Sequence, residues 1–154
     1  TTGVGNDLFR PENTCTRAQV VTFLWRAKGC PEPTITENPF KDISPKDYYY
    51  KAVLWAAEQG ITTGVTKDRF APEKGCTRAQ VVTFLWRAES KPQITPVQNP
   101  FQDVGEDTYY ADAVAWAVKQ GITTGKTKDK FAPEDLCTRG QIVTFLYRAK
   151  DLFP

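Results

Sequence analysis

Apolar residues recur along this chain at the three-to-four-residue spacing of amphipathic helices, and the pattern repeats. A first helix is predicted around 47–60 and again around 107–121, where aromatic and small apolar residues share one face and a glycine follows. A second helix is predicted to start at Thr16, Thr77 and Thr138, with an apolar stripe along it. The pattern therefore predicts helices in alternation with loops.

The segments between these helices are rich in Gly, Pro and Asp, as in TTGVTKDRFAPEKG at 62–75, and predict turned loops. One phenylalanine per loop is expected to hold it to the core: Phe9, Phe70 and Phe131. Proline-rich segments at 30–44 and 90–105 follow the second helices, and we expect them to cross between units.

The pattern repeats with a fixed period of 61 residues. CTRAQVVTFLWRA occurs verbatim at 15–27 and 76–88, and an edited copy, CTRGQIVTFLYRA, occupies 137–149. A fixed period indicates supersecondary units that bury their faces against one another. We predict a single module over 1–154, made of the back half of a first unit at 1–30, a second unit at 31–91 and a third unit at 92–154.

The start of the chain corresponds to the middle of a unit. Thr1-Thr2-Gly3 aligns with Thr62-Thr63-Gly64, so the first unit's leading helix is missing from the sequence. The chain also has no Met and shows no secretory signal, and we expect a processed or excised piece.

Each repeated segment opens with a helix-capping pattern. Thr followed three residues later by Gln fits a capping box, in which the two side chains satisfy the first backbone amides. The pairs are Thr16 with Gln19, Thr77 with Gln80, and Thr138 with Gln141. The Cys before each Thr is expected to be a small buried hydrophobe that faces the fourth helical residue.

The cysteines are expected to be free thiols. A Cys15–Cys30 bridge would join the two ends of one helix, roughly 18 Å apart at 1.5 Å per residue, whereas a disulfide tolerates about 7 Å between α-carbons. Bridges among Cys15, Cys76 and Cys137 would require the three helix starts to converge. Because the chain has no C-x-x-C pair and no His, no metal site is predicted.

Local rules leave one residue type of the repeat unexplained, and it stands at Arg17, Arg78 and Arg139. The helix dipole disfavours a cation at the first helical position by roughly 0.3–1 kcal/mol. Replacing Arg78 and Arg139 with Ala is therefore expected to abolish ligand retention and to leave thermal stability unchanged or slightly raised. One use is an anion site, in which the guanidinium and the free amides of the helix start bind carboxylate or phosphate. The other is an intramolecular salt bridge to Glu73, Glu134 or Asp103, and the sequence supports both equally.

The remaining cations and aromatic residues have simpler interpretations. The second arginine of each helix is expected to stabilise the helix's C-terminal end, at Arg26, Arg87 and Arg148. Most aromatic residues recur at helical spacing and are expected in the core. The flat faces of Trp55 and Trp116 also suit a sugar ring, and we include both as candidate ligand contacts.

Composition narrows the function. The formal net charge of the 154 residues is only +2, which argues against nucleic-acid binding, and the longest apolar run is too short for membrane insertion. Without His, the usual general base is missing, and no carboxylate pair stands out as a glycosidase site. We therefore expect a non-catalytic protein with no cofactor.

The ordered combination NPFKDI, YYYKAVLWAAEQGITTG and RFAPEKGCTRAQVVTFLWRA resembles an S-layer homology repeat over essentially the whole chain. The resemblance implies a mainly α fold, a pseudo-threefold spindle of helix-loop-helix repeats with a helical-bundle core. It also implies an extracellular module on the bacterial cell wall or S-layer, which binds secondary wall polysaccharide, often pyruvylated, in grooves between repeats. The alternative is a self-assembling surface-layer segment without a glycan ligand, and self-association to complete the first unit is a further expectation.

Carried over by position, the family's key arginine corresponds to Arg17, Arg78 and Arg139, and its preceding threonine to Thr16, Thr77 and Thr138. Gln stands where the family has an acidic residue, at Gln19, Gln80 and Gln141, which removes a negative charge beside each arginine. The turn glycines expected to let the backbone approach a sugar are Gly64 and Gly125. In the third copy Gly140 replaces Ala, which weakens that helix start by about 0.5–1 kcal/mol.

Overall fold

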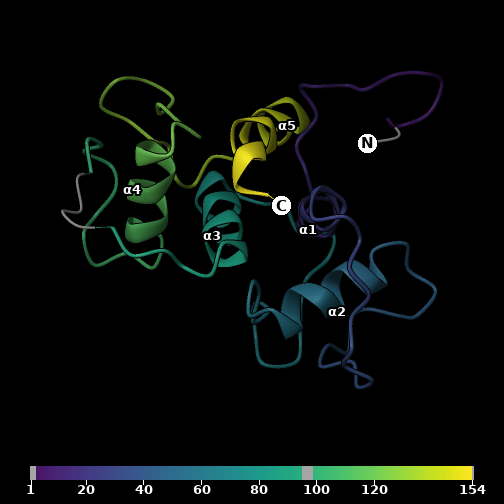
Figure 1. The fold of residues 1–154 in the computed structure, drawn as a ribbon. Coiled ribbons are helices and arrows are strands. Elements are labelled where there is room, and N and C mark those ends of the chain that lie inside the picture. Colours follow the sequence, from purple (N-terminus) through teal and green to yellow (C-terminus); the bar gives the residue numbers. More distant parts are fainter. Residues whose placement is uncertain (1–2, 95–98, 154) are drawn as a thin grey trace.

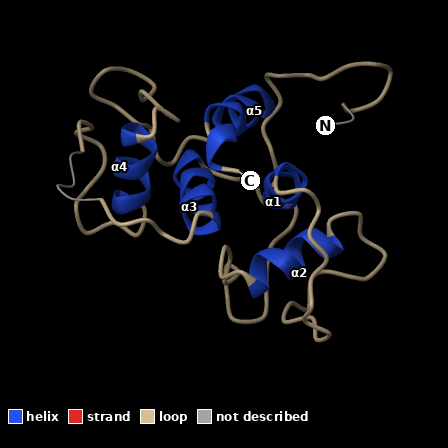
Figure 2. Ribbon diagram, in the orientation of Figure 1, coloured by secondary structure: helices blue, strands red, loops and turns tan. Residues whose placement is uncertain are grey.

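The computed structural model describes residues 3–94 and 99–153, and within them the protein is mainly helical and has no named β-strand (Figure 2). The elements are α1 (Arg17–Ala27), α2 (Tyr50–Glu58), α3 (Arg78–Ala88), α4 (Ala111–Lys119), α5 (Arg139–Arg148) and a short 3-10 helix, η1 (Lys150–Leu152). This confirms the predicted helical class and the predicted alternation of helices and loops.

Helices α1, α3 and α5 begin with the predicted capping boxes. In all three, the Gln backbone amide donates to the Thr hydroxyl at 3.2–3.3 Å, and the Thr backbone amide donates to the Gln side-chain oxygen at 3.1–3.2 Å. Two orphan donors are thus satisfied at each helix start.

Helices α2 and α4 are shorter than the sequence pattern predicts. Each starts at a residue whose predecessor makes no side-chain cap, and each ends before a glycine in the left-handed region, Gly60 at φ +66° and Gly121 at φ +69°. The glycines were correctly predicted to end these helices, since a left-handed residue favours Gly.

The closest helix pairs cross the predicted unit boundaries. Helix α2 packs on α1, and α4 packs on α3, so the leading helix of each sequence unit rests on the trailing helix of the unit before (Figure 1). Helix α1 also contacts α3 and α5. The three capped helices therefore form the centre of the molecule, with α2 and α4 on the outside.

A ring of backbone hydrogen bonds joins the starts of the three central helices. The Cys15 amide donates to the Cys137 carbonyl, the Cys137 amide to the Cys76 carbonyl, and the Cys76 amide to the Cys15 carbonyl, each at 2.9 Å. The ring closes on itself and marks a pseudo-threefold axis. The helix starts do converge, which the sequence analysis did not expect, yet the thiols are free and these three are buried.

Below this ring, equivalent apolar side chains of the three central helices form the core. Val20, Val81 and Ile142 are all buried, as are Phe23, Phe84 and Phe145. The predicted loop phenylalanines Phe70 and Phe131 are fully buried as well.

Candidate functional site: the seams between units

Each repeated arginine lies in a seam between two units. The Arg17 Nε donates to the Phe70 carbonyl at 2.9 Å, and the side chain is 3% exposed. Its Cζ lies 4.9 Å from the Phe70 ring centroid and 5.5 Å from that of Phe84. The guanidinium is therefore held by one backbone acceptor and two aromatic rings, and the two phenylalanines come from the following unit.

The same arrangement recurs at the other two seams. Arg78 donates to the Phe131 carbonyl at 2.8 Å and contacts the rings of Phe131 and Phe145. Arg139 donates to the Phe9 carbonyl at 2.8 Å and lies near the rings of Phe9 and Phe23, which closes the cycle between the third unit and the first. Cation–π contacts of this kind compensate for the unfavourable dipole at the helix start.

The prediction that the helix starts offer free amides to an anion is wrong. The Arg17 and Ala18 amides donate to the carbonyls of Lys74 and Pro72 at 2.9 and 3.0 Å. The corresponding amides of α3 and α5 likewise donate to loop carbonyls, at Asp135, Pro133, Asn13 and Pro11. Because the loops take these donors, only side chains remain to bind a ligand in the seams.

The salt-bridge alternative also fails for two of the three arginines. Among the described residues, no ion pair joins Arg17 or Arg78 to a carboxylate. Asp103 instead accepts from the backbone amides of Phe131 and Ala132, at 2.9 and 2.8 Å. Burial lowers the pKa of Arg17 and of Arg78, although both stay protonated at neutral pH.

One guanidinium nitrogen has no acceptor among the described residues. The Arg17 Nη2 is buried and is the one buried side-chain nitrogen or oxygen in the described part of the chain without a hydrogen-bond partner. An unsatisfied buried donor is costly, and a donor on a permanently charged group is the costliest kind. The donor set at this seam therefore suits an acceptor that carries negative charge.

The seam at Arg139 opens into a cavity of about 400 Å³. Its walls are Gly3, Val4, Gln19, Thr22, Phe23, Arg26, Tyr48 and Arg139. These residues combine the motif arginine of the third unit, the capped helix of the first unit and a tyrosine that precedes α2. Two guanidinium groups, a carboxamide and a phenol thus line one hollow of a size that accepts small ligands.

The carboxamide in this cavity has donors to spare. Gln19 uses its Oε1 to accept from the Thr16 amide, and its side-chain nitrogen donates to none of the residues that the structure describes. A carboxylate at this position would offer only acceptors. The substitution of Gln for an acidic residue therefore changes the wall of the cavity from acceptor to donor, which is the change an anionic ligand favours.

Sequence reasoning missed the tyrosines Tyr48 and Tyr109. Both are exposed and stack edge-on against the next tyrosine, with ring centroids 4.9 and 5.0 Å apart. Partial burial raises the pKa of Tyr48, whereas the charges of Arg26 and Arg139 lower it. The signal was present in the doubled tyrosines of DYYY and DTYY, since one member of each pair must face away from the core.

The second seam has the corresponding residues. Burial raises the pKa of Tyr109, and the positive charge of Arg87 partly offsets this increase. Tyr109 also lies close enough to Arg17 to raise the pKa of that arginine. At the third seam the period of 61 places the corresponding tyrosine ahead of Thr1, outside the sequence.

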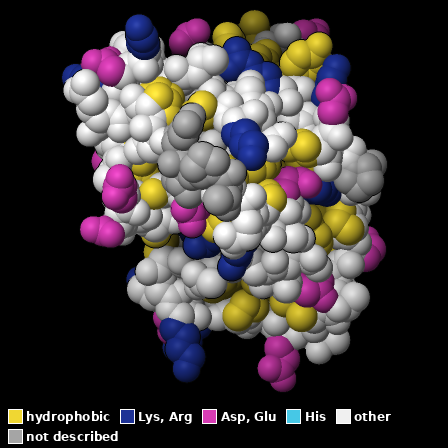
Figure 3. All heavy atoms as spheres, turned by 60° about the vertical axis from the view of Figure 1, so that its left-hand side comes forward, with side chains coloured by type: hydrophobic (Ala, Val, Ile, Leu, Met, Phe, Trp, Pro, Cys, Tyr) yellow, Lys and Arg dark blue, Asp and Glu magenta, His cyan; other side chains and the backbone are white. Residues whose placement is uncertain are grey.

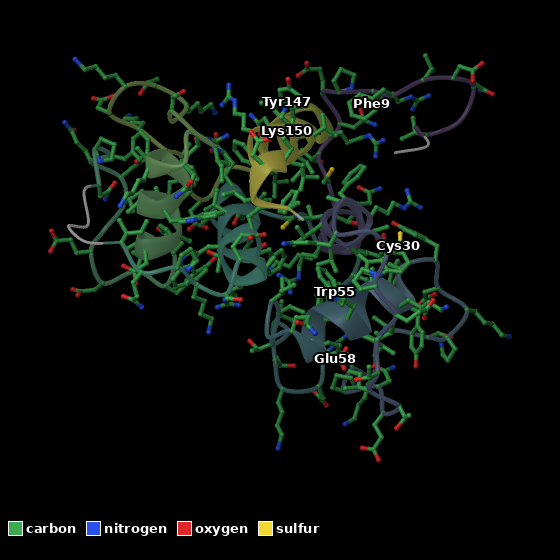
Figure 4. The ribbon with its side chains drawn as sticks, in the orientation of Figure 1. Phe9, Cys30, Trp55, Glu58, Tyr147 and Lys150 are labelled. Atoms are coloured by element: carbon green, nitrogen blue, oxygen red, sulfur yellow. The ribbon has the colours of Figure 1, made fainter. Side chains whose placement is uncertain are left out.

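Four predicted ligand contacts lie away from the arginine cavity. Gly64 (φ +83°) and Gly125 (φ +88°) serve their own turns, because a Cβ on Gly64 would lie 2.6 Å from the carbonyl oxygens of Thr66 and Arg69. Trp116 is 2% exposed, which leaves almost no surface for a sugar ring. Trp55, on α2 (Figure 4), lines a different cavity. Ligand binding by these four residues stays a prediction.

The face of the molecule drawn in Figure 3 has no large patch of a single charge sign. Lys and Arg side chains are interspersed with Asp and Glu over the face drawn in Figure 3, in keeping with a net charge of +2. Among the described residues, no helix is long and apolar enough to cross a membrane, and no cluster of three His, Cys, Asp or Glu residues is arranged for a metal ion.

Fold and seams together define a class: a helical tandem-repeat module whose polar sites lie where successive units meet. The S-layer homology domain profile matches residues 39–82 and 100–143. The chain belongs to the S-layer homology family.

Relatives of the chain include an enzyme, an anchoring protein and a surface-layer protein, all much longer than this chain. It is 34% identical over 145 residues to an endoglucanase from Bacillus sp. (strain KSM-635), covering 91% of this chain and 15% of that protein. It is 26% identical to a cellulosome-anchoring protein from Acetivibrio thermocellus, covering 99% of this chain and 35% of that protein. It is 32% identical to the surface-layer 125 kDa protein of Lysinibacillus sphaericus, covering 75% of this chain and 9% of that protein.

The chain thus spans roughly a third or less of each of these relatives. Family membership places the module outside the cell, at the bacterial surface, and gives it a cell-wall anchoring role. Its likeness to an endoglucanase covers a small segment of that enzyme and carries no catalytic activity over to this chain.

Proposed function

We propose that this module holds its parent protein on the cell wall by binding an acidic, pyruvylated secondary wall polysaccharide in the seams between units. Arg17, Arg78 and Arg139 bind the carboxylate of the glycan. The flanking glutamines donate to its hydroxyl or carboxylate oxygens, and Tyr48 and Tyr109 cover the sugar face at two of the seams. The module itself catalyses no reaction.

One observation carries this proposal, the unsatisfied donor of Arg17. A buried charged nitrogen without an acceptor is stabilised by an anionic ligand, and a guanidinium binds a carboxylate with a fork of two parallel hydrogen bonds. The cavity at Arg139 supports the same ligand class, because a second arginine and a glutamine line it. An exposed tyrosine at its rim adds the flat apolar surface that a pyranose ring requires.

The test is retention on purified, pyruvylated wall glycan by a variant that carries Arg17→Lys, Arg78→Lys and Arg139→Lys. Lysine keeps the charge and most of the apolar stem but lacks the fork. Loss of charge-assisted hydrogen bonds of about 1.5–3 kcal/mol predicts retention weakened by about tenfold or more. Thermal melting of the same variant establishes that it is folded.

Two controls sharpen the result. Arg69→Lys changes an exposed arginine in a loop and is expected to bind as the unmodified protein does. Glycan from which pyruvate has been removed by mild acid is expected to bind weakly to every variant. Full retention by the folded triple variant would disprove the proposal.

A specific feature also favours association through α5, and we propose that this helix binds another helix of the α2 and α4 type. Val21 and Val82 are fully buried in α1 and α3, whereas their counterpart Val143 in α5 is only partly buried. Tyr147, labelled in Figure 4, is 67% exposed where the other two central helices carry a half-buried Trp. Helix α5 thus leaves open the face on which α2 and α4 rest in the other two units.

The test is a synthetic peptide of residues 44–61 that carries a fluorescent dye, titrated with the protein while the fluorescence anisotropy of the dye is followed. Saturable binding that is lost with Val143→Asp supports the proposal, and a peptide with Val53→Asp is the matched control. If the peptide does not bind and light scattering shows concentration-dependent dimers, the face joins two copies of the chain instead.

A further inference from the structure

A second cavity, of about 480 Å³, lies at the other end of the central helices. It is lined by the C-terminal ends of α1 and α3, by α2 and by the connectors that follow: Lys28, Pro31, Trp55, Gln59, Ile61, Arg87, Ala88, Ser90 and Lys91. None of the three repeated motif arginines lines it. Its volume falls within the range of about 300–1,000 Å³ that small-ligand sites occupy.

Positive charge prevails in this cavity. Lys28, Arg87 and Lys91 line it, and no carboxylate is among its lining residues. Glu89, which follows Ala88 in the chain, forms an ion pair with Lys28. The Lys28 Nζ also lies 4.7 Å from the Phe153 ring centroid, so Lys28 is already engaged. Two cations remain, Arg87 and Lys91.

These two cations keep donors for a ligand. Arg87 uses Nη1 to donate to the Ile61 carbonyl at 3.1 Å, which fixes the plane of the guanidinium and leaves its other nitrogens available. Lys91 is exposed and takes part in none of the ion pairs among the described residues. A planar fork held in place beside a mobile ammonium suits a carboxylate.

The pseudo-symmetry shows that the fold does not require this charge. Shifting by 61 residues retains the frame of the cavity, because Trp116, Gln120, Ile122, Arg148 and Ala149 replace their counterparts by the same residue types. The charged positions change: Lys28 becomes Glu89, Ser90 becomes Asp151 and Lys91 becomes Leu152. The cavity thus has three positive charges, whereas the corresponding positions of the next unit carry one positive and two negative charges among otherwise matching residues.

We infer that the cavity between α1, α2 and α3 is a second, separate binding site for an anionic sugar residue, one that carries a carboxylate. Arg87 and Lys91 bind the carboxylate, and the Gln59 carboxamide bonds to ring hydroxyls. Trp55 is 6% exposed, and its edge, which lines the cavity, contacts the apolar face of the ring. The class of ligand, though not the cavity or its charge, rests on the proposed function. The matching position around Trp116 does not bind an anion, since its charges are reversed.

The test follows the indole N–H signals of Trp55 and Trp116 by nuclear magnetic resonance, while a pyruvylated methyl glycoside is added. The Trp55 signal is expected to shift and saturate, and the Trp116 signal to stay in place. The same glycoside without pyruvate is expected to leave both signals unchanged. The two tryptophans thus serve as a matched pair within one molecule.

A double variant, Ser90→Asp with Lys91→Leu, gives the cavity two of the three residues that differ in its symmetric copy, and the fold already accepts both at the third unit. Binding reported by Trp55 is expected to weaken by about tenfold or more, as the loss of a charge-assisted hydrogen bond predicts. Lys46→Leu removes an exposed lysine elsewhere and is expected to change nothing.

Three outcomes would overturn the inference: no shift at Trp55, equal shifts at Trp55 and Trp116, or unchanged affinity in the double variant. The result is independent of the seam sites. Wall retention that depends on the motif arginines, with no Trp55 shift, refutes only the second site. A saturable Trp55 shift together with full wall retention by the folded triple Lys variant refutes only the proposed function.

Discussion

At the scale of single residues, the repeated arginines show what a local rule can and cannot detect. The helix dipole argument identified Arg17, Arg78 and Arg139 as exceptions that need a compensating contact. The contact itself lies 53 residues further along the chain for Arg17 and Arg78, in the rings and carbonyls of Phe70 and Phe131. No local pattern gives that partner, so the expectation that arginines can be removed at no cost to stability takes no account of this contact.

Arg78→Ala is expected to lower the free energy of unfolding by about 2–4 kcal/mol, as a large-to-small change at a buried site does. The change also leaves the Phe131 carbonyl without its donor. Urea denaturation measures the difference. Arg69→Ala, at an exposed loop position, is expected to stay within about 0.5 kcal/mol of the unmodified protein. An Arg78→Ala variant as stable as Arg69→Ala would contradict the seam described above.

The buried thiols predict a loss of stability at alkaline pH. Burial raises the pKa of Cys15 to about 11 and those of Cys76 and Cys137 to about 12, from an ordinary value of 9.0. The unfolded chain therefore releases these protons first as the pH rises. Stability is fully present below pH 9 and falls between about pH 9 and 12, by about 1 kcal/mol per pH unit for each thiol.

Chemical denaturation at a series of pH values checks this slope. A Cys76→Ala variant is expected to be less stable at pH 7 yet to show a shallower decline above pH 9, because one of the three protons no longer contributes. An identical slope in the two proteins would show that the alkaline decline has another origin, such as the tyrosines.

At the scale of elements, the sequence predicted the helices well and the loops poorly. The start of each capped helix is marked in the sequence by a Thr and a Gln three residues apart. All three starts were therefore predicted to the residue. The loops depend on distant partners. Ala71 and Ala132 adopt φ of +58° and +57°, a region that favours glycine. No neighbouring residue in the sequence predicts this backbone conformation.

The partners that hold these strained alanines are Asp42 and Asp103. Each carboxylate accepts two successive backbone amides of the following loop, in the case of Asp42 those of Phe70 at 2.9 Å and Ala71 at 2.7 Å. The aspartates stand 28 and 29 residues before the amides that they bind. From the sequence, Asp103 was a candidate salt-bridge partner of an arginine or a member of a carboxylate pair, and neither interpretation predicts its bonds to the loop amides.

Replacement of Asp103 by Ala is expected to lower the free energy of unfolding by about 2–5 kcal/mol, since two buried or half-buried amides lose a charged acceptor. Asp103→Asn retains one acceptor oxygen and is expected to cost about half as much. Thermal and urea denaturation measure both. Equal stability of the Ala variant and the unmodified protein would mean that the loop holds its conformation without the carboxylate.

At the scale of the whole molecule, the period of 61 predicted equivalent units but not how they meet. Sequence units pair α2 with α3, whereas the structure packs α2 on α1 and α4 on α3. The period alone cannot decide between these arrangements, because both bury the same apolar faces. The candidate site shares this limit: its arginines could be named from the sequence, but its tyrosines and second arginines come from neighbouring units.

The ring of hydrogen bonds predicts that the backbone amides of Cys15, Cys76 and Cys137 are protected from hydrogen exchange to the same degree. Each of the three amides can open only if two units separate, so all three are expected to exchange with the free energy of global unfolding. Native-state exchange monitored by nuclear magnetic resonance measures this, with the exposed loop amides as the rapidly exchanging reference. Exchange of one ring amide well ahead of the other two would show that its unit opens alone.

The closed ring also has a consequence for the order of events in folding. Two of its hydrogen bonds join residues 61 apart, whereas the bond from the Cys15 amide to the Cys137 carbonyl joins residues 122 apart. The entropic cost of closing the longer loop is greater by only about 0.6 kcal/mol. The longer connection can form, however, only when both ends of the chain have reached the axis. The start and the end of the chain must therefore meet late, and until they do the seam between the third unit and the first stays open.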